Sequence, residues 1–164
     1  MAQPLALVDA SPLIGLAHVG GLGWLRKLYR KAAITPTVRS EVLTGLNRLG
    51  EREIGAAIRA RQISVLAAEP STPSLPGLGD GEATTLRAAL AHGAGALVIL
   101  DDLSARRAAQ RSGIAVVGTA AVIVDAKRAR LIKAARPLFE RLLDGGFRIS
   151  DALVEAVLVE LGER

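Results

Sequence analysis

The sequence contains no cysteine and only two histidines among its 164 residues. The missing thiols exclude disulfides, thiolate metal sites and cysteine nucleophiles, and they agree with a reducing compartment. His18 and His92 belong to no Ser-His-Asp pattern and to no spacing typical of metal-binding histidines. We therefore expect both histidines to be structural and any hydrolytic chemistry to depend on other side chains.

Aromatic residues are also scarce, at 2% of the chain, although hydrophobic residues make up 50%. The core must therefore be built from alanine, valine, leucine and isoleucine, a composition that favours helices packed on a buried aliphatic sheet. A chain of this length fits one hydrophobic core. We predict an α/β fold in a single domain over residues 1–164.

Long hydrophobic runs are missing as well. No run of about 18 apolar residues is free of charge or glycine, and the N-terminal apolar run is broken at Asp9 without a basic leader. These absences predict a soluble cytoplasmic protein with no membrane partner. The net charge of +5 favours a polyanionic partner, although the excess of arginine over lysine can also reflect genome composition.

Two aliphatic segments, residues 5–8 and 96–100, are each followed by an acid and then by a helical pattern. Asp9 follows the first segment, and Asp101 follows the second. Further short strands are expected at residues 33–34, 63–66 and 114–117, with helices between them. Ligands gather beyond the carboxyl ends of the strands in open α/β sheets, so Asp9 and Asp101 should be neighbours there.

Two glutamates are expected to join these aspartates from the starts of helices. Thr35-Pro36 opens a helix that should reach Leu46 and that carries Glu41 beside its apolar stripe. A later helix, starting near residue 81, carries Glu82 on its inward face. Because the start of such a helix and the end of the preceding strand lie at the same sheet edge, four acids can converge.

Four carboxylates at one edge would repel one another unless protons or a hard cation neutralised them. Mg²⁺ and Mn²⁺ prefer carboxylate oxygens together with water and phosphate. Such an ion can polarise a phosphate oxygen and lower the pKa of a water that attacks phosphorus, with a second ion at the leaving oxygen as an alternative arrangement. The residues therefore predict metal-dependent phosphodiester hydrolysis by Asp9, Glu41, Glu82 and Asp101.

Each of these acids also has a structural explanation. Asp9 or Asp101 can cap the following helix, Glu82 can stabilise a helix dipole, and Glu41 can be a solvated helix residue. Ser11 is followed by proline, which fits a helix N-cap.

Two groups of basic residues can bind RNA phosphate. Arg106 and Arg107 follow the second acid, and arginine can bind a phosphate with two hydrogen bonds. Lysine and arginine are also frequent between Lys127 and Arg136. For both groups, a solvated helix face is the alternative, and no interleaved aromatic residue decides between the two.

The acids lie in segments that together resemble the motifs of PIN domains: DASPLI at 9–14, VRSEV at 38–42, GDGEA at 79–83 and LDDLSARRAA at 100–109. GT at 118–119 and FRISDALVEAVLVELGE at 147–163 are similar to an uncharacterised PIN branch that is grouped with VapC-like toxins. Each motif alone is weak, whereas the combination is specific and spans nearly the whole chain.

This resemblance implies a three-layer α/β/α PIN-like fold with a mostly parallel central sheet. It also implies a Mg²⁺- or Mn²⁺-dependent ribonuclease that acts as the toxin of a toxin-antitoxin pair, forms a homodimer and is blocked by a small antitoxin protein. The family's acidic positions are matched here by Asp9, Glu41, Glu82 and Asp101.

Three further residues are placed near the metal by the same resemblance. Asp102 stands where this branch often has glutamate, so it is a fifth ligand, a group that acts through a ligand, or only a helix-start acid. Ser11 matches a small hydroxyl residue near the metal, and Thr119 is expected to play a similar part after the last central strand.

Other functions are compatible with parts of the pattern. A PIN-like fold can bind nucleic acid or a protein partner without cutting, because a fold alone does not guarantee chemistry. A receiver-like phosphoacceptor domain also gathers acids around Mg²⁺, but here the acid pair follows a late strand. A nucleotide-binding regulator would need a phosphate loop, and no convincing one is present.

Overall fold

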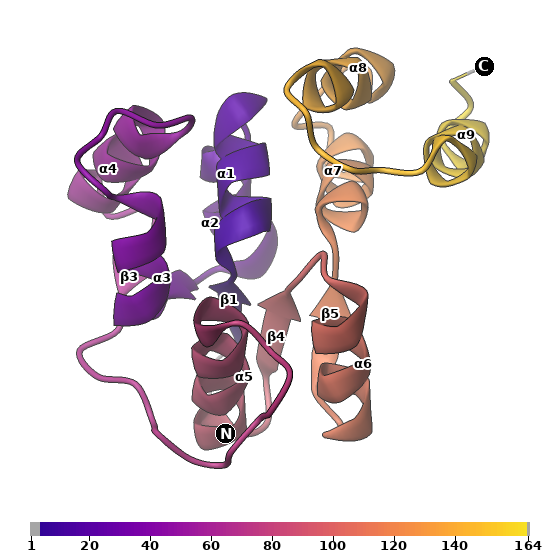
Figure 1. The fold of residues 1–164 in the computed structure, drawn as a ribbon. Helices are drawn as coiled ribbons and strands as arrows, with labels where there is room; N and C mark the ends of the chain where they lie inside the picture. The colour runs from indigo at the N-terminus through magenta and orange to yellow at the C-terminus, as the bar shows by residue number, and fades with distance from the viewer. Residues whose placement is uncertain (1–3, 164) are drawn as a thin grey trace.

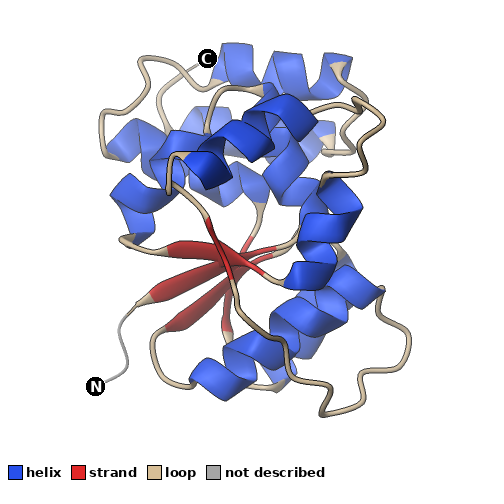
Figure 2. Cartoon of the chain, turned by 90° about the vertical axis from the view of Figure 1, so that its left-hand side faces the viewer, coloured by secondary structure: helices blue, strands red, loops and turns tan. Residues whose placement is uncertain are grey.

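The computed structural model describes residues 4–163, and its centre is a five-stranded sheet in which every paired strand is parallel. The strand order is β3-β2-β1-β4-β5. The strands are short: β1 (Leu5–Val8), β2 (Ala32–Ile34), β3 (Ser64–Val65), β4 (Ala96–Ile99) and β5 (Ala115–Val117). The expected fold class, with helices on both sides of a parallel sheet, is confirmed (Figures 1 and 2).

Helices connect the strands, as parallel pairing requires. In chain order they are α1 (Ala10–His18), α2 (Leu22–Tyr29), α3 (Pro36–Val42), α4 (Glu51–Arg59), α5 (Asp80–His92), α6 (Leu103–Arg111), α7 (Thr119–Arg128), α8 (Arg136–Asp144) and α9 (Asp151–Glu160). None of the helices in the described part of the chain is long and apolar enough to cross a membrane.

Alternating strand residues divide the core between the two faces of the sheet, because successive side chains of a strand point in opposite directions. Leu7 and Val98 pack with the alanine-rich faces of α5 and α6. Val8 and Ile99 belong to the larger cluster, which includes residues of α1, α2, α7 and α8. These two layers and the sheet between them make the three-layer arrangement.

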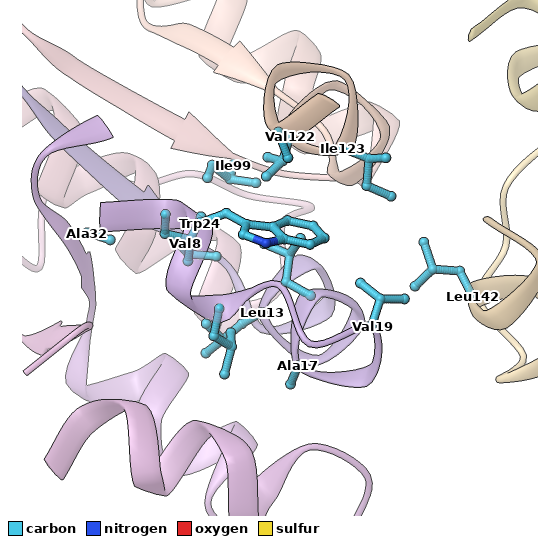
Figure 3. Packing of buried hydrophobic residues seen from close by; sticks show 14 of the residues in the cluster. Val8, Leu13, Ala17, Val19, Trp24, Ala32, Ile99, Val122, Ile123 and Leu142 are labelled. Carbon is cyan, nitrogen blue, oxygen red and sulfur yellow. The ribbon is translucent and has the colours of Figure 1, made fainter. Parts of the chain in front are cut away.

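Trp24 fills the centre of the larger cluster, among Val8, Ile99 and Val122 (Figure 3). Its ring lies so close to Gly21 that a Cβ on that glycine would sit 2.5 Å from a ring carbon. An aliphatic core with a single tryptophan therefore depends on a glycine to admit the large side chain. This cluster supports the back of α1, which follows directly from Asp9.

Two helix boundaries differ from the sequence-based expectation. Asp9, and not Ser11, is the N-cap residue of α1, so Ser11 lies in the first turn of the helix. The helix opened by Thr35-Pro36 ends at Val42, and Leu46 lies beyond it with 68% of its surface exposed. The backbone leaves the helical conformation at the C-cap residue Leu43, and Gly45 beyond it is left-handed, so the apolar spacing that reached Leu46 does not continue as a helix.

Candidate metal centre

Asp9 and Asp101 lie at the same edge of the sheet because β1 and β4 are adjacent and parallel. Val8 pairs with Ile99 in the register of these strands, and the backbone N–H of Asp9 donates to the carbonyl of Ile99 at 3.1 Å. Both strands therefore end at the same level of the sheet. That register places Asp9 and Asp101 close together, as expected.

Glu41 reaches the same edge from the last turn of α3, and not from the start of a helix as expected, because α3 is only seven residues long. Its Oε1 accepts a hydrogen bond of 3.1 Å from the backbone N–H of Gly81, in the first turn of α5. A Cβ at Gly81 would lie 2.5 Å from Glu41 Oε2 and 3.0 Å from Asp9 Oδ1. The two carboxylates thus converge on the bare Cα of this glycine, and any side chain there would displace them.

Glu82 is the third residue of α5 and bends back toward the start of its own helix. Its Oε2 accepts a hydrogen bond of 3.0 Å from the backbone N–H of Gly79, the N-cap residue. Gly79 has no side chain to return that bond, so only one half of a capping box is formed. Glu82 therefore fills a structural role and at the same time lines the cavity in front of Asp9.

Thr119 holds Asp101 with two hydrogen bonds from the first residue of α7. The backbone N–H donates to Oδ1 at 2.8 Å, and the hydroxyl donates to Oδ2 at 2.6 Å. Both oxygens of the carboxylate are thereby fixed, and Thr119 itself is buried. Thr119 thus contacts the predicted ligand Asp101 directly, and its expected role near a metal stays a prediction.

The charges of these acids are not balanced by ion pairs. Among the described residues, no lysine, arginine or histidine forms an ion pair with Asp9, Glu41, Glu82 or Asp101. Burial raises the pKa of Asp9 from 3.8 to about 7, and the negative charges of the other three add to this effect. The metal-free site therefore holds Asp9 protonated at mildly acidic pH.

Glu41 shows the same tendency more weakly. Partial burial of its carboxyl raises its pKa, against the hydrogen bond from Gly81, and the charges of Asp80 and Glu82 raise it further. Asp80, at the start of α5, therefore also belongs to this acidic neighbourhood.

A cavity of about 460 Å³ opens in front of the acids. Its acidic side is lined by Asp9, Glu82, Asp101 and Asp102, together with the hydroxyl residues Ser11 and Thr119. The opposite side is formed by Leu142 and by residues 146–149 of the loop between α8 and α9. Glu41 does not line this cavity, although its carboxylate and that of Asp9 lie close together at Gly81.

The acids do not close around a single point. In residues 4–163, no three acidic or histidine side chains are arranged as ligands of one ion. A cage made entirely of protein ligands is therefore not preformed. The donor set nevertheless fits Mg²⁺ or Mn²⁺, because such ions retain several waters and need only one or two direct carboxylates. The unbalanced charge around Asp9 supports this fit.

The structure shows a role for Asp102, for which the sequence left three explanations open. It is the N-cap residue of α6, and its Oδ2 accepts a hydrogen bond of 3.0 Å from the backbone N–H of Ala105. This geometry is that of the helix-start acid, one of the three explanations considered above. Ser11 is exposed at the cavity, where its hydroxyl can meet a ligand or bound water.

The two arginines that follow the acid pair differ in position. Arg106 is half-buried beside Asp101: a Cβ on Gly118 would lie 2.5 Å from Arg106 Nη1 and 3.0 Å from Asp101 Oδ1. Arg107 is exposed and lines neither of the cavities that include Asp101. RNA binding by either residue stays a prediction, and position favours Arg106.

The loop between α8 and α9 is the part of the site that sequence reasoning missed. Phe147 stacks on His18 with ring centroids 6.0 Å apart, and its ring also lies against Gly15 of α1. This contact holds the loop across the cavity, where Arg148 and Ile149 line the wall. The only signal was the FRIS segment at 147–150, which carried the resemblance but suggested no role.

His18 itself is held within the structure. Its Nε2 lies 3.1 Å from the carbonyl oxygen of Arg141, and its ring contacts Phe147. The ring thus supports the loop that forms one wall of the cavity, which agrees with the expected structural role.

Comparison with known families identifies the fold. Residues 5–163 match the model of a family described as DUF3368, PIN domain. The chain belongs to the PIN domain family. PIN domains are typically nucleases that use divalent metal ions.

Comparisons with individual proteins add less. A PilT N-terminus domain protein, SSO1118, from the hyperthermophilic archaeon Sulfolobus solfataricus P2 is similar in structure, with 18% sequence identity and a TM-score of 0.49. The similarity covers 72% of this PIN domain chain and 89% of the archaeal chain. No curated protein sequence matches this one.

Proposed function

We propose that this PIN domain protein is a metal-dependent endoribonuclease that hydrolyses phosphodiester bonds of RNA. The observation that carries the proposal is the acidic cavity lined by Asp9, Glu82, Asp101 and Asp102, where the described residues provide no ion pair to balance the predicted ligands. A purely structural cluster of acids would only lower the stability of the fold, whereas a nuclease needs such a cluster to hold a divalent ion against a phosphate. The basic net charge of the chain supports a nucleic acid as substrate.

Asp9, Glu41, Glu82 and Asp101 would hold the ion, directly or through its waters. When bound, Mg²⁺ or Mn²⁺ supplies charge neutralisation at the phosphate and a more acidic water. The chain supplies orientation: the N–H and hydroxyl of Thr119 fix Asp101, and the N–H of Gly81 fixes Glu41. Asp102 remains at the rim as the cap of α6.

The high pKa of Asp9 gives the proposed activity a pH dependence. Below about pH 7, the metal-free site holds a proton on Asp9 that competes with a cation for the carboxylate. Cation binding should therefore strengthen as the pH rises through neutrality. Activity at subsaturating metal concentration should rise in the same range.

The biological setting of the proposal is a toxin-antitoxin pair. A site rich in carboxylates would be blocked by a small antitoxin protein that inserts a basic side chain, because opposite charges complement each other at an interface. The toxin would act as a homodimer in the cytoplasm. Co-purification with the product of an adjacent small reading frame, and loss of cleavage on its addition, would support this setting.

The alternative is a PIN domain protein that binds nucleic acid or a partner without cutting. The absence of a preformed three-ligand site in residues 4–163 favours this alternative. Metal-dependent turnover of RNA distinguishes the two functions, because only the nuclease would show it.

The deciding experiment incubates the purified protein with a mixed structured RNA in the presence of Mg²⁺, Mn²⁺ or EDTA. We expect cleavage with metal, none with EDTA, and loss of cleavage in Asp9→Asn and Asp101→Asn. Asp144→Asn is a matched control, because Asp144 is exposed at the end of α8 and lines no part of the acidic cavity. Absence of cleavage by folded, inhibitor-free protein would leave the binding function as the better conclusion.

A further inference from the structure

The positive charge of the chain is concentrated in one segment. Residues 22–63 contain nine of the 21 basic residues but only three of the 16 acidic ones, so this segment carries a formal charge of +6. The rest of the chain has 12 basic and 13 acidic residues and carries a charge of −1. A general preference for arginine would not produce this difference, because elsewhere acids match the bases. The imbalance is therefore a property of the segment that forms α2, β2, α3 and α4.

Two of the three acids in this segment are engaged elsewhere. Glu41 belongs to the acidic edge of the sheet, where it accepts a backbone N–H of α5. Glu51 closes the turn before α4, where its carboxylate accepts the backbone N–H groups of Thr44 at 2.9 Å and Gly45 at 3.2 Å. Glu53 is the remaining acid of the segment. The basic side chains therefore have little anionic compensation.

Four arginines of this segment gather along α4 and at its end. Arg52 and Arg59 are seven residues apart, so they lie on one side of α4, opposite the buried Ile54. α4 packs against α2, and Arg26 Nη1 of α2 donates to the carbonyl of Arg61, just beyond α4, at 3.5 Å. All four side chains are exposed and form no ion pair within residues 4–163. We call Arg26, Arg52, Arg59 and Arg61 the α4 arginine strip.

The basic run from Lys127 to Arg136, which the sequence suggested for RNA binding, differs from this strip. Lys127 forms an ion pair with Glu163, and Arg128 forms one with Glu160. The side chain of Arg136 donates to the carbonyl of Glu163 at 3.1 Å. Three of the five basic side chains of the run are thus committed to the C-terminal part of the chain. A structural role is the better explanation for this run.

The strip lies outside the acidic cavity, on the same side of the sheet as α1 (Figure 1). None of its four arginines lines that cavity. α4 begins beside the second half of α1, because a Cβ on Gly50 would lie 3.3 Å from the Cβ of Ala17. Ala17 follows Asp9 by eight residues, which corresponds to about 12 Å along a helix. A ligand that reaches from the acidic edge to the strip must therefore be an extended molecule.

The charge and length of the strip define the chemistry of that ligand. Like charges without partners repel one another, and a polyanion removes this repulsion. Guanidinium groups bind phosphate oxygens with two hydrogen bonds, and release of counterions from a nucleic acid favours such contacts. A small anion does not need cations spread along a helix of nine residues, which is about 14 Å long. A chain of phosphates fits this spacing.

We propose that the α4 arginine strip binds the phosphate backbone of RNA at a distance from the bond that is cut. Contacts to phosphate carry no sequence information, so this binding is independent of base sequence. The strip supplies affinity, and the acidic cavity supplies the chemistry. The choice of RNA rests on the proposed function. The backbone of DNA offers the same phosphates, and the test separates the two.

The test measures binding without cleavage. Two labelled RNA duplexes of unrelated sequence, and a DNA duplex with one of these sequences, are titrated by fluorescence anisotropy in EDTA over a series of salt concentrations. Paired and stacked bases leave the backbone as the main contact. We expect similar affinity for the two RNA duplexes and a steep fall with salt. Different affinities for the two sequences would overturn backbone binding, and tighter binding of DNA would overturn the assignment to RNA.

A pair of double variants locates the binding surface. Arg52→Gln with Arg59→Gln should weaken RNA binding on the order of tenfold and reduce the slope of log affinity against log salt by about 1–2. Arg111→Gln with Lys133→Gln is the control, because both side chains are exposed outside the strip. Arg59 and Arg111 each lie in the last turn of a helix, so the two double variants are also matched in position. The control should change affinity by about twofold or less.

Glutamine is nearly as favourable as arginine in a helix, and circular dichroism confirms that both double variants fold. Equal effects of the two would mean that only net charge matters, and would overturn the proposal even if the protein cleaves RNA. Absence of RNA binding by wild type would also overturn it. A selective effect of the strip variant supports the proposal even if no cleavage is seen.

Where cleavage is seen, the strip variant should raise KM and leave kcat within about twofold of wild type, because it removes binding remote from the reacting bond. A lower kcat with unchanged KM would contradict the proposal. Asp9→Asn should lose cleavage and keep its affinity for RNA in EDTA. A failure of the proposed nuclease function is thereby distinguished from a failure of the strip.

Discussion

The pKa of Asp9 makes a prediction about stability that needs no substrate. Its carboxyl ionises near 3.8 in an unfolded chain and near 7 in the folded protein. Between these values the folded state keeps a proton that the unfolded state has released, so the free energy of unfolding falls as pH rises. The stabilising contribution is fully present below pH 3.8 and is lost as pH rises to about 7.

The size of the effect follows from the same values. At about 1.4 kcal/mol per pH unit, the full difference corresponds to about 4 kcal/mol, of which about 2 kcal/mol should be lost between pH 5 and pH 7. Asp9 is only 6% exposed, so solvent screening reduces this number little. The raised pKa of Glu41 acts in the same direction.

Urea denaturation in EDTA at pH 5, 7 and 8 measures the effect. We expect wild type to lose stability across this range and Asp9→Asn to lose much less, because asparagine carries no charge at any of these values. At pH 8 the variant should be more stable than wild type by about 2 kcal/mol or more. Asp144→Asn, which changes an exposed carboxylate outside the site, should follow the wild-type profile.

The reasoning is refuted if wild type is as stable at pH 8 as at pH 5. It is also refuted if Asp9→Asn falls with pH as steeply as wild type. Either result would mean that Asp9 is ionised in the folded, metal-free protein at acidic pH. The acidic cavity would then be better solvated or better paired than its geometry indicates.

Three more predictions concern the metal and the groups that orient its ligands. Saturating Mg²⁺ at pH 8, at about 100 times its dissociation constant, should add about 2.7 kcal/mol to wild-type stability and much less to Asp9→Asn, as thermal unfolding can show. Gly81→Ala should lower the rate of RNA cleavage on the order of 100-fold, because the new Cβ displaces the carboxylates of Glu41 and Asp9. Gly23→Ala is the control and should keep activity, because its Cβ meets nothing closer than 3.9 Å. Equal activity of the two variants in a cleavage time course would contradict this prediction. Thr119→Val should raise the Mg²⁺ concentration needed for half-maximal cleavage rate by about 10-fold or more, because the hydroxyl bond to Asp101 is lost. An unchanged concentration would show that this hydrogen bond is dispensable.

Local sequence patterns were sufficient to predict the strands and the two aspartates at their ends. Leu5–Val8 and Ala96–Ile99 are short aliphatic runs, and the parallel register then places Asp9 and Asp101 together. Thr35 caps α3 through its hydroxyl, as its sequence with Pro36 indicated. These features depend on residues that are close together in the chain.

The remaining parts of the site depend on contacts between distant segments. Glu41 and Asp9 come close together only because Gly81 has no side chain between them, and no local pattern shows that a glycine is needed there. Likewise, the path of residues 146–149 across the cavity is set by contact of Phe147 with α1. Periodicity describes faces of helices and strands, but it does not describe where a loop crosses another element.

The order in which the walls of the acidic cavity occur along the chain has a consequence for synthesis. Asp9 is among the earliest residues, Asp101 comes much later, and the wall that carries Arg148 is later still. A ribosome therefore produces every predicted ligand before it produces the loop that completes the cavity. A chain synthesised only as far as Asp101 would carry the four predicted ligands and still lack the wall that residues 146–149 supply.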